Sequence, residues 1–214
     1  MYSQISCPLK LGPSDIDIRR EISRSKTSTI YEIQLVGKQY AMKLGRYTKK
    51  GRDLNRFRCE LDAYHNLHEF GVCDGFVPAF HGYIDRIDPS AFHPPLKHFV
   101  GDKFQPRGIL LEYLPGAERL NCENYSEDRF RDAVNGIKEI HGAFVHHHDI
   151  YPKNMLVVSG ERIVWVDFDV ATTFSNMGPR ERAYCEYETE LVRSFGKLLS
   201  EDKAQGLPPN TKYY

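Results

Sequence analysis

The chain has 214 residues, enough for one domain or for two small lobes that share a cleft. Its 29 basic and 29 acidic residues give a formal net charge of zero, which argues against a nucleic-acid or membrane-surface partner. Hydrophobic residues make up 41% and support a buried core, but no apolar run is long enough to span a membrane. The five scattered cysteines form no Cys-x-x-Cys pair, which argues against a disulfide framework or a structural zinc site. We therefore expect a soluble, cytoplasmic protein without a secretory leader.

Two segments near the N-terminus, residues 30–36 and 39–43, alternate between apolar and polar side chains. This period of two predicts a pair of strands. Gly37 and Lys38 lie between the segments and predict a tight hairpin turn. Lys43 then ends the second strand.

The next segments mix one helix with further strands. Residues 53–68 carry apolar side chains at helical spacing, and Glu60 flanks that stripe. Residues 76–84 predict a short strand, and residues 109–114 predict a buried strand that ends at a Pro-Gly pair. Residues 85–108 hold four prolines without periodicity, so they predict a long loop of a kind that is usually functional or disordered.

The second half of the chain is mainly helical. Residues 127–142 predict a helix with Ser126 as its N-cap. Residues 155–158 and 162–166 predict a small hairpin. A last amphipathic helix is predicted from three apolar residues at helical spacing: Leu191, Phe195 and Leu198. The order of elements therefore predicts an α+β fold.

The strongest motif is His147-His148-Asp149-Ile150-Tyr151-Pro152-Lys153-Asn154, followed by Asp167-Phe168-Asp169. It resembles the H-R-D-L-x-x-x-N and D-F-G motifs of protein kinases. Upstream, Ala41-Met42-Lys43 is similar to the V-A-I-K strand, and Leu111-Glu112-Tyr113-Leu114 looks like the kinase hinge. The resemblance covers roughly residues 20–175 and is to the protein-kinase-like superfamily, nearest to small atypical, fungal-type members and similar to aminoglycoside- or lipopolysaccharide-type small kinases.

The resemblance implies a single two-lobed domain over residues 1–214. A sheet-rich N-lobe would cover about residues 15–113, and a shortened helical C-lobe about residues 114–202. Residues 203–214 would form a flexible tail.

The resemblance also implies an ATP-dependent phosphotransferase that uses Mg²⁺ and a hydroxyl acceptor on a protein or a small molecule. Lys43 would hold the α- and β-phosphates, and Glu60 would hold Lys43 in place. Asp149 would accept the proton of the attacking hydroxyl, with the charge of Lys153 nearby.

Metal and adenine contacts follow from the same resemblance. Three residues would offer oxygen ligands to magnesium: Asn154, Asp167 and Asp169. Ala41 and Leu156 would sandwich the adenine. Backbone groups at Glu112 and Leu114 would bond the edge of the ring.

The chain departs from the family pattern in four places. No glycine lies between Pro13 and Val36, so the glycine-rich phosphate loop is missing. His148 replaces the arginine of H-R-D, and Asp169 replaces the glycine of D-F-G. No A-P-E element is visible in the short segment after Asp167. These departures keep two alternatives open: a catalytically impaired pseudokinase that binds nucleotide or protein, and a kinase-fold enzyme with other ATP chemistry.

Two other patterns have simpler interpretations. The run His146-His147-His148 invites a zinc site, but adjacent side chains point different ways, so we expect His147 to brace the catalytic loop through backbone hydrogen bonds. The basic residues of segment 43–58 could grip a phosphorylated partner or RNA, but such a run is usually a solvated face.

Overall fold

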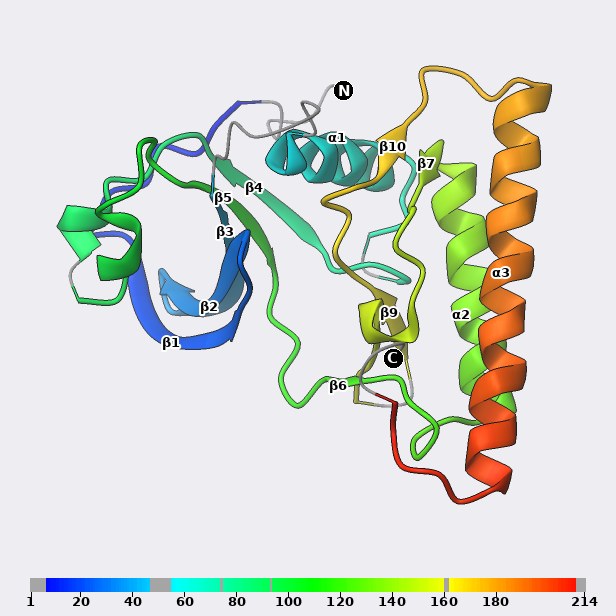
Figure 1. Cartoon of the computed structure of the whole chain (residues 1–214). Helices are drawn as coiled ribbons and strands as arrows, with labels where there is room; N and C mark the ends of the chain where they lie inside the picture. The colour runs from blue at the N-terminus through cyan, green and yellow to red at the C-terminus, as the bar shows by residue number, and fades with distance from the viewer. Residues whose placement is uncertain (1–6, 47–54, 74, 93, 160–161, 211–214) are drawn as a thin grey trace. The chain divides into compact units, whose positions relative to one another are not determined.

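The computed structural model describes residues 7–46, 55–73, 75–92, 94–159 and 162–210 (Figure 1). The chain divides into two compact units, the first formed by Met1–Leu61 with Ala79–Tyr113 and the second by Asp62–Pro78 with Leu114–Tyr214. The fold is α+β, with a sheet-rich N-terminal region followed by helices. Among the described residues, no helix combines the length and the apolar character needed to cross a membrane.

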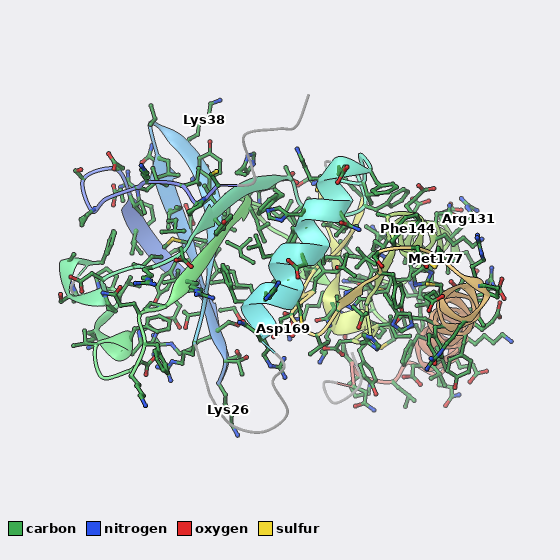
Figure 2. The ribbon with its side chains drawn as sticks, turned by 90° about the horizontal axis from the view of Figure 1, so that it is seen from above. Lys26, Lys38, Arg131, Phe144, Asp169 and Met177 are labelled. Atoms are coloured by element: carbon green, nitrogen blue, oxygen red, sulfur yellow. The ribbon has the colours of Figure 1, made fainter. Side chains whose placement is uncertain are left out.

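The first unit is built on a five-stranded antiparallel sheet. Its spatial order is β1-β2-β3-β5-β4. The strands are β1 (Asp17–Arg24), β2 (Ser28–Leu35), β3 (Lys38–Gly45), β4 (Phe80–Ile84) and β5 (Arg107–Glu112). Figure 2 shows Lys26 and Lys38 at opposite ends of this sheet. Helix α1 (Arg56–Glu69) starts in this unit and ends in the second, and the part of the predicted helix around Leu54 lies outside the described residues.

The β2–β3 turn lies one residue earlier than the sequence predicts. Leu35 pairs with Lys38, so Lys38 belongs to β3 and the two-residue loop is Val36-Gly37. Both loop residues have positive φ, at 47° and 80°. This is the geometry of a two-residue hairpin turn, and glycine adopts it without steric cost. The prediction missed the turn because valine disfavours positive φ.

Residues 85–108 were expected to form a long loop, but much of this segment packs on the first unit's core. It contains two short 3₁₀ helices, η2 (Pro89–Phe92) and η3 (Lys97–Phe99). Leu96 and Phe99 are fully buried in the same hydrophobic cluster as strand residues of the sheet. Because the apolar side chains are separated by prolines and short turns, they show no periodicity in sequence.

The second unit contains two long helices that lie side by side, α2 (Glu127–Gly142) and α3 (Pro179–Ala204) (Figure 1). The bounds of α2 match the prediction, and the Ser126 hydroxyl accepts a hydrogen bond from the backbone N–H of Arg129 as an N-cap. Short strands complete the unit: β6 (Glu118–Arg119), β8 (Met155–Val157) and β9 (Ile163–Trp165) form one sheet, and β7 (Val145–His146) pairs with β10 (Thr172–Thr173).

The face that α3 buries is not the one the sequence suggests. Leu191 and Leu198, two of the apolar residues from which the amphipathic helix was predicted, are 39% and 49% exposed. The buried side chains are instead mostly small or polar: Cys185, Glu188, Thr189, Val192, Gly196 and Leu199. A Cβ at Gly196 would lie 2.4 Å from the Phe130 ring of α2, so the glycine permits close approach of the two helices.

Candidate functional site

In the first unit, β3 and α1 bring Lys43 and Glu60 together. The Lys43 Nζ atom lies 2.8 Å from Oε1 and 2.7 Å from Oε2 of Glu60. Both side chains are almost fully buried, with 8% and 4% of their surface exposed. A buried ion pair contributes little net stability, because desolvation offsets the attraction. The contacts to both carboxylate oxygens hold the Lys43 charge in one position.

The other candidate residues of this unit lie on the central strands. Ala41 pairs with Leu111 across β3 and β5. The backbone N–H of Glu112 donates to the Ala79 carbonyl at 2.8 Å, and the Glu112 carboxylate accepts from the Ala79 N–H at 3.2 Å. The Glu112 N–H is therefore bonded within the first unit.

The β1–β2 turn occupies the position of the missing glycine-rich loop. The Ser25 hydroxyl accepts hydrogen bonds from the backbone N–H groups of Thr27 and Ser28, at 3.2 and 3.0 Å. Ser25 also donates its own N–H to the Ser28 carbonyl at 2.8 Å. Two amides that could contact phosphate are therefore already bonded within the turn.

In the second unit, a short 3₁₀ helix, η4 (Pro152–Asn154), folds the candidate catalytic loop back on itself. Asp149 Oδ2 lies 3.2 Å from Lys153 Nζ. Asn154 Nδ2 donates to the Asp149 carbonyl at 2.7 Å, which turns Asn154 Oδ1 away from that bond. An amide oxygen held in this way is a suitable hard ligand for Mg²⁺.

His147 makes the bracing contacts expected from the sequence. Its Nδ1 accepts the Asp149 N–H at 3.3 Å, so Nε2 carries the proton and donates to the Val166 carbonyl at 3.1 Å. The ring is fully buried, and desolvation lowers the pKa of His147, which favours this neutral form. One imidazole thus ties the loop to the residue before Asp167.

Backbone strain is concentrated at the same place. His148 and Asp167 have φ values of 67° and 69°, which are unusual for residues other than glycine. Phe168 anchors the second segment, with its ring centroid 4.7 Å from that of His147 and 5.4 Å from that of Tyr64. Asp169 is 8% exposed. Strained conformations of this kind persist only where surrounding contacts impose them, and they are common at functional sites.

Glu188 of α3 holds this loop through hydrogen bonds to its backbone. The sequence analysis did not identify this residue. Its Oε2 accepts the His147 N–H at 3.1 Å and lies 2.8 Å from His141 Nε2, while Oε1 accepts the His148 N–H at 2.7 Å. Burial by itself would raise the pKa of Glu188, but the hydrogen bond from His141, the charge of His146 and the two backbone N–H groups lower it to about 2. The only sequence signal was a glutamate on the buried face of a helix.

The histidines near Glu188 do not make a metal centre. His146 stacks with His141 at a centroid distance of 6.1 Å, and burial lowers the pKa of His146. No group of three or more His, Cys, Asp or Glu side chains among the described residues is arranged to hold a metal ion by itself. The zinc interpretation of the histidine run therefore finds no support in the described part of the chain.

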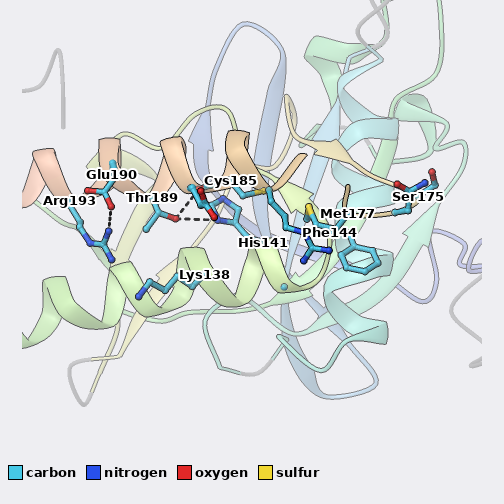
Figure 3. A pocket seen from close by; sticks show the side chains of 13 residues that line it. Lys138, His141, Phe144, Ser175, Met177, Cys185, Thr189, Glu190 and Arg193 are labelled. Carbon is cyan, nitrogen blue, oxygen red and sulfur yellow. Dashed lines mark hydrogen bonds and ion pairs between the residues drawn. The ribbon is translucent and has the colours of Figure 1, made fainter. Parts of the chain in front are cut away.

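A cavity of the second unit lies on the flank of α3 that carries Arg182, Glu186 and Arg193. It has a volume of about 710 Å³ and is lined by residues of α2, α3 and the segment before α3, including Lys138, Phe144, Met177 and Arg193 (Figure 3). Thr189 and Cys185 also line the cavity, and the Thr189 hydroxyl donates a hydrogen bond to the Cys185 carbonyl at 2.9 Å. None of the predicted site residues lines it.

The structure thus assembles two groups of predicted residues. Lys43 and Glu60 are in contact in the first unit, where Ala41 and Glu112 lie on β3 and β5. The second unit holds the remaining residues: Leu114, Asp149, Lys153, Asn154, Leu156, Asp167 and Asp169. Leu156 lies on β8, where it pairs with Val164.

A lysine paired with a helix glutamate and an Asp–Asn loop followed by a second aspartate are the features of a protein-kinase-like chain. Known proteins support this relationship. The chain is 28% identical over 134 residues to the maternal embryonic leucine zipper kinase of Xenopus laevis, covering 63% of this chain and 18% of that protein. It is 38% identical over 53 residues to a probable serine/threonine-protein kinase CHK1 homolog of Encephalitozoon cuniculi, covering 25% of this chain and 13% of that protein.

These similarities are low and partial. No family model matches the chain. The chain spans less than a fifth of the length of the curated relatives it matches. It covers 18% of the maternal embryonic leucine zipper kinase of Danio rerio, the same share as for the Xenopus laevis protein. The similarities nevertheless relate the chain to the Ser/Thr protein kinases.

Proposed function

We propose that this chain is an ATP-dependent phosphotransferase that moves the γ-phosphate of ATP to a hydroxyl group on a protein or a small molecule. The observation that carries the proposal is the buried Lys43–Glu60 pair, in which both carboxylate oxygens contact Nζ. Phosphoryl transfer needs positioned phosphates and neutralised charge more than covalent help. A lysine fixed in this way would hold the α- and β-phosphates of the nucleotide.

The second unit supplies what the acceptor and the metal require. Asp149 would take the proton as the acceptor oxygen bonds to the γ-phosphorus and the bond to the β,γ-bridging oxygen breaks, with ADP as the leaving group. Asn154 Oδ1, Asp167 and Asp169 offer oxygen ligands that suit Mg²⁺, which would neutralise charge on the phosphates. Lys153, 3.2 Å from Asp149, would place a positive charge beside the transferred group.

The adenine would lie between Ala41 and Leu156, with its edge bonded by the Glu112 carbonyl and by Leu114. The Glu112 N–H is bonded to the Ala79 carbonyl. The replacement of the D-F-G glycine by Asp169 favours the atypical, fungal-type or small-molecule kinase classes. We further propose that the two units act as the N- and C-lobes of one domain.

A second candidate function is a pseudokinase that binds nucleotide or protein without phosphoryl transfer. It is favoured by the β1–β2 turn, which contains no glycine and uses its Thr27 and Ser28 amides internally. Retention of the full set of charged residues favours the active enzyme. Product analysis separates the two, because only the enzyme converts ATP to ADP.

The first experiment is thermal unfolding with ATP, with and without Mg²⁺. A ligand at a hundredfold its dissociation constant stabilises the folded state by about 2.7 kcal/mol, which raises Tm by several degrees for a chain of this size. We expect a Mg²⁺-dependent shift that Asp167→Ala abolishes. Asp132→Asn, a matched loss of one carboxylate on α2, should keep the shift. No shift for the unmodified chain at millimolar Mg-ATP would reject the nucleotide site.

A further inference from the structure

Helix α3 carries a second apolar stripe on its solvent side. Tyr184, Tyr187, Leu191 and Leu198 are 44%, 67%, 39% and 49% exposed. Their spacing of three, four and seven residues places them on one face of the helix. Phe195 borders the stripe and packs against the Tyr151 ring in a tilted arrangement, at a centroid distance of 5.3 Å. Exposed large apolar side chains that share one face of a helix are a feature of interaction sites.

The stripe is distinct from the other two sides of α3. The side that packs inside the second unit carries the small and polar residues around Glu188 and Val192. The flank that lines the cavity is charged, with Arg182, Glu186 and Arg193. The helix therefore buries one face in the core of the second unit and lines the cavity with a charged flank. The apolar row on its remaining side is exposed and is not covered by another element among the described residues.

Opposite charges stand at the two ends of the stripe. Arg180 lies one turn before Tyr184, whose hydroxyl accepts a hydrogen bond from the Arg180 Nε at 2.8 Å. Asp202 lies one turn after Leu198. Within the described part of the chain, neither Arg180 nor Asp202 forms an ion pair of its own. Both charges are thus available to a partner that runs along the stripe.

The sequence of the stripe is symmetric about its centre. Leu191 is the midpoint between Tyr184 and Leu198, and it is also the midpoint between Arg180 and Asp202. A two-fold interface requires a surface that complements itself after rotation. Rotation about an axis at Leu191 places Tyr184 opposite Leu198 and Arg180 opposite Asp202 of the other copy, within about one helical turn.

We propose that α3 pairs with α3 of a second copy of this chain, in antiparallel orientation, to form a two-fold dimer. The charges select this orientation, because a parallel pair would place Arg180 against Arg180 and Asp202 against Asp202. The aromatic and leucine side chains supply the buried centre, and the charges supply the rim. This proposal does not depend on phosphoryl transfer.

The available area predicts a modest affinity. Aromatic side chains bury about 150–250 Å² each, so the exposed fractions of 44% and 67% give Tyr184 and Tyr187 together on the order of 200 Å² to contribute. A stable interface buries about 800 Å² per partner. The leucines and the rim residues of α3 bring the total toward the lower end of specific interfaces. We therefore expect a dimer that dissociates on dilution.

Cysteine cross-linking tests the geometry directly, in a Cys7→Ser background that removes the exposed thiol. Leu191→Cys lies on the proposed axis, so mild oxidation should link two copies through it. Tyr184→Cys alone should not link, because the two copies of that position lie about 21 Å apart along the axis. A mixture of Tyr184→Cys and Leu198→Cys chains should link. Efficient self-linking of Tyr184→Cys, as in a parallel pair, would overturn the proposal, as would no linking of Leu191→Cys.

Sedimentation velocity of the full chain tests the association without cross-links. Leu191→Asp should yield monomer, whereas Val100→Asp, which alters an exposed apolar residue of the first unit, should leave the dimer intact. Arg180→Asp and Asp202→Arg should each shift the dimer dissociation constant upward by about tenfold, and the double variant should restore it. A monomer at every accessible concentration, or a dimer that Leu191→Asp leaves unchanged, would overturn the proposal.

Discussion

Replacing Glu188 by glutamine should loosen the candidate catalytic loop and destabilise the fold. The carboxylate accepts three hydrogen bonds, two of them from the backbone of His147 and His148. A glutamine amide keeps the shape, but it presents an NH₂ group to one of these donors. The difference between the ordinary pKa of 4.5 and the value of about 2 in the folded chain, at 1.36 kcal/mol per pKa unit, corresponds to about 3 kcal/mol.

The sign of this contribution fixes its pH dependence. Because the pKa of Glu188 is lower in the folded chain, its stabilisation is complete above about pH 4.5 and is lost as the pH falls toward 2. Urea unfolding at pH 7 should show Glu188→Gln less stable by about 3 kcal/mol, with a difference from the unmodified chain that shrinks below pH 4.5.

The control is Glu186→Gln, which changes an exposed glutamate two residues away and should alter the unfolding free energy by less than about 0.5 kcal/mol. A loss below about 1 kcal/mol for Glu188→Gln at pH 7, or a difference that is the same at pH 7 and pH 3, would refute the assignment of these hydrogen bonds to an ionised Glu188.

Two further predictions concern packing and charge. Lys43→Met and Glu60→Leu should each cost about 3–5 kcal/mol in urea unfolding, because each breaks a buried ion pair. The double variant should recover most of that loss but not nucleotide binding, and single variants with additive costs would argue against the pair. Gly196→Ala should cost about 1–3 kcal/mol in the same assay, because its Cβ would lie 2.4 Å from the Phe130 ring. The control is Gly142→Ala, whose Cβ would have nothing within 4 Å and which should be neutral. Equal effects of the two variants would contradict the close approach of the helices.

The motif residues and the local elements could be read from the sequence. The bounds of α2, its Ser126 cap and the β8–β9 hairpin follow from short-range patterns. The motif spacing also predicted the kinase-like relationship that the comparisons support. These features could be predicted because capping, hydrophobic period and motif spacing each involve residues within a few positions of one another.

The missed features depend on contacts between distant segments. Residues 85–108 show no periodicity, yet Leu96 and Phe99 pack in the core of the first unit. The Val36-Gly37 turn was displaced by one residue because the β2–β3 register is set by the whole strand pair and not by local turn preference.

Helix α3 shows most clearly what only the tertiary structure decided. Its sequence contains two faces that could be buried, one with Leu191 and Leu198 and one with Val192 and Leu199, and hydrophobicity alone favours the first. Close approach at Gly196 and the hydrogen bonds of Glu188 to the candidate catalytic loop select the second. The sequence thus determined that a helix forms here and which residues carry the motif, while packing between distant segments determined which face of the helix is buried and which is left exposed.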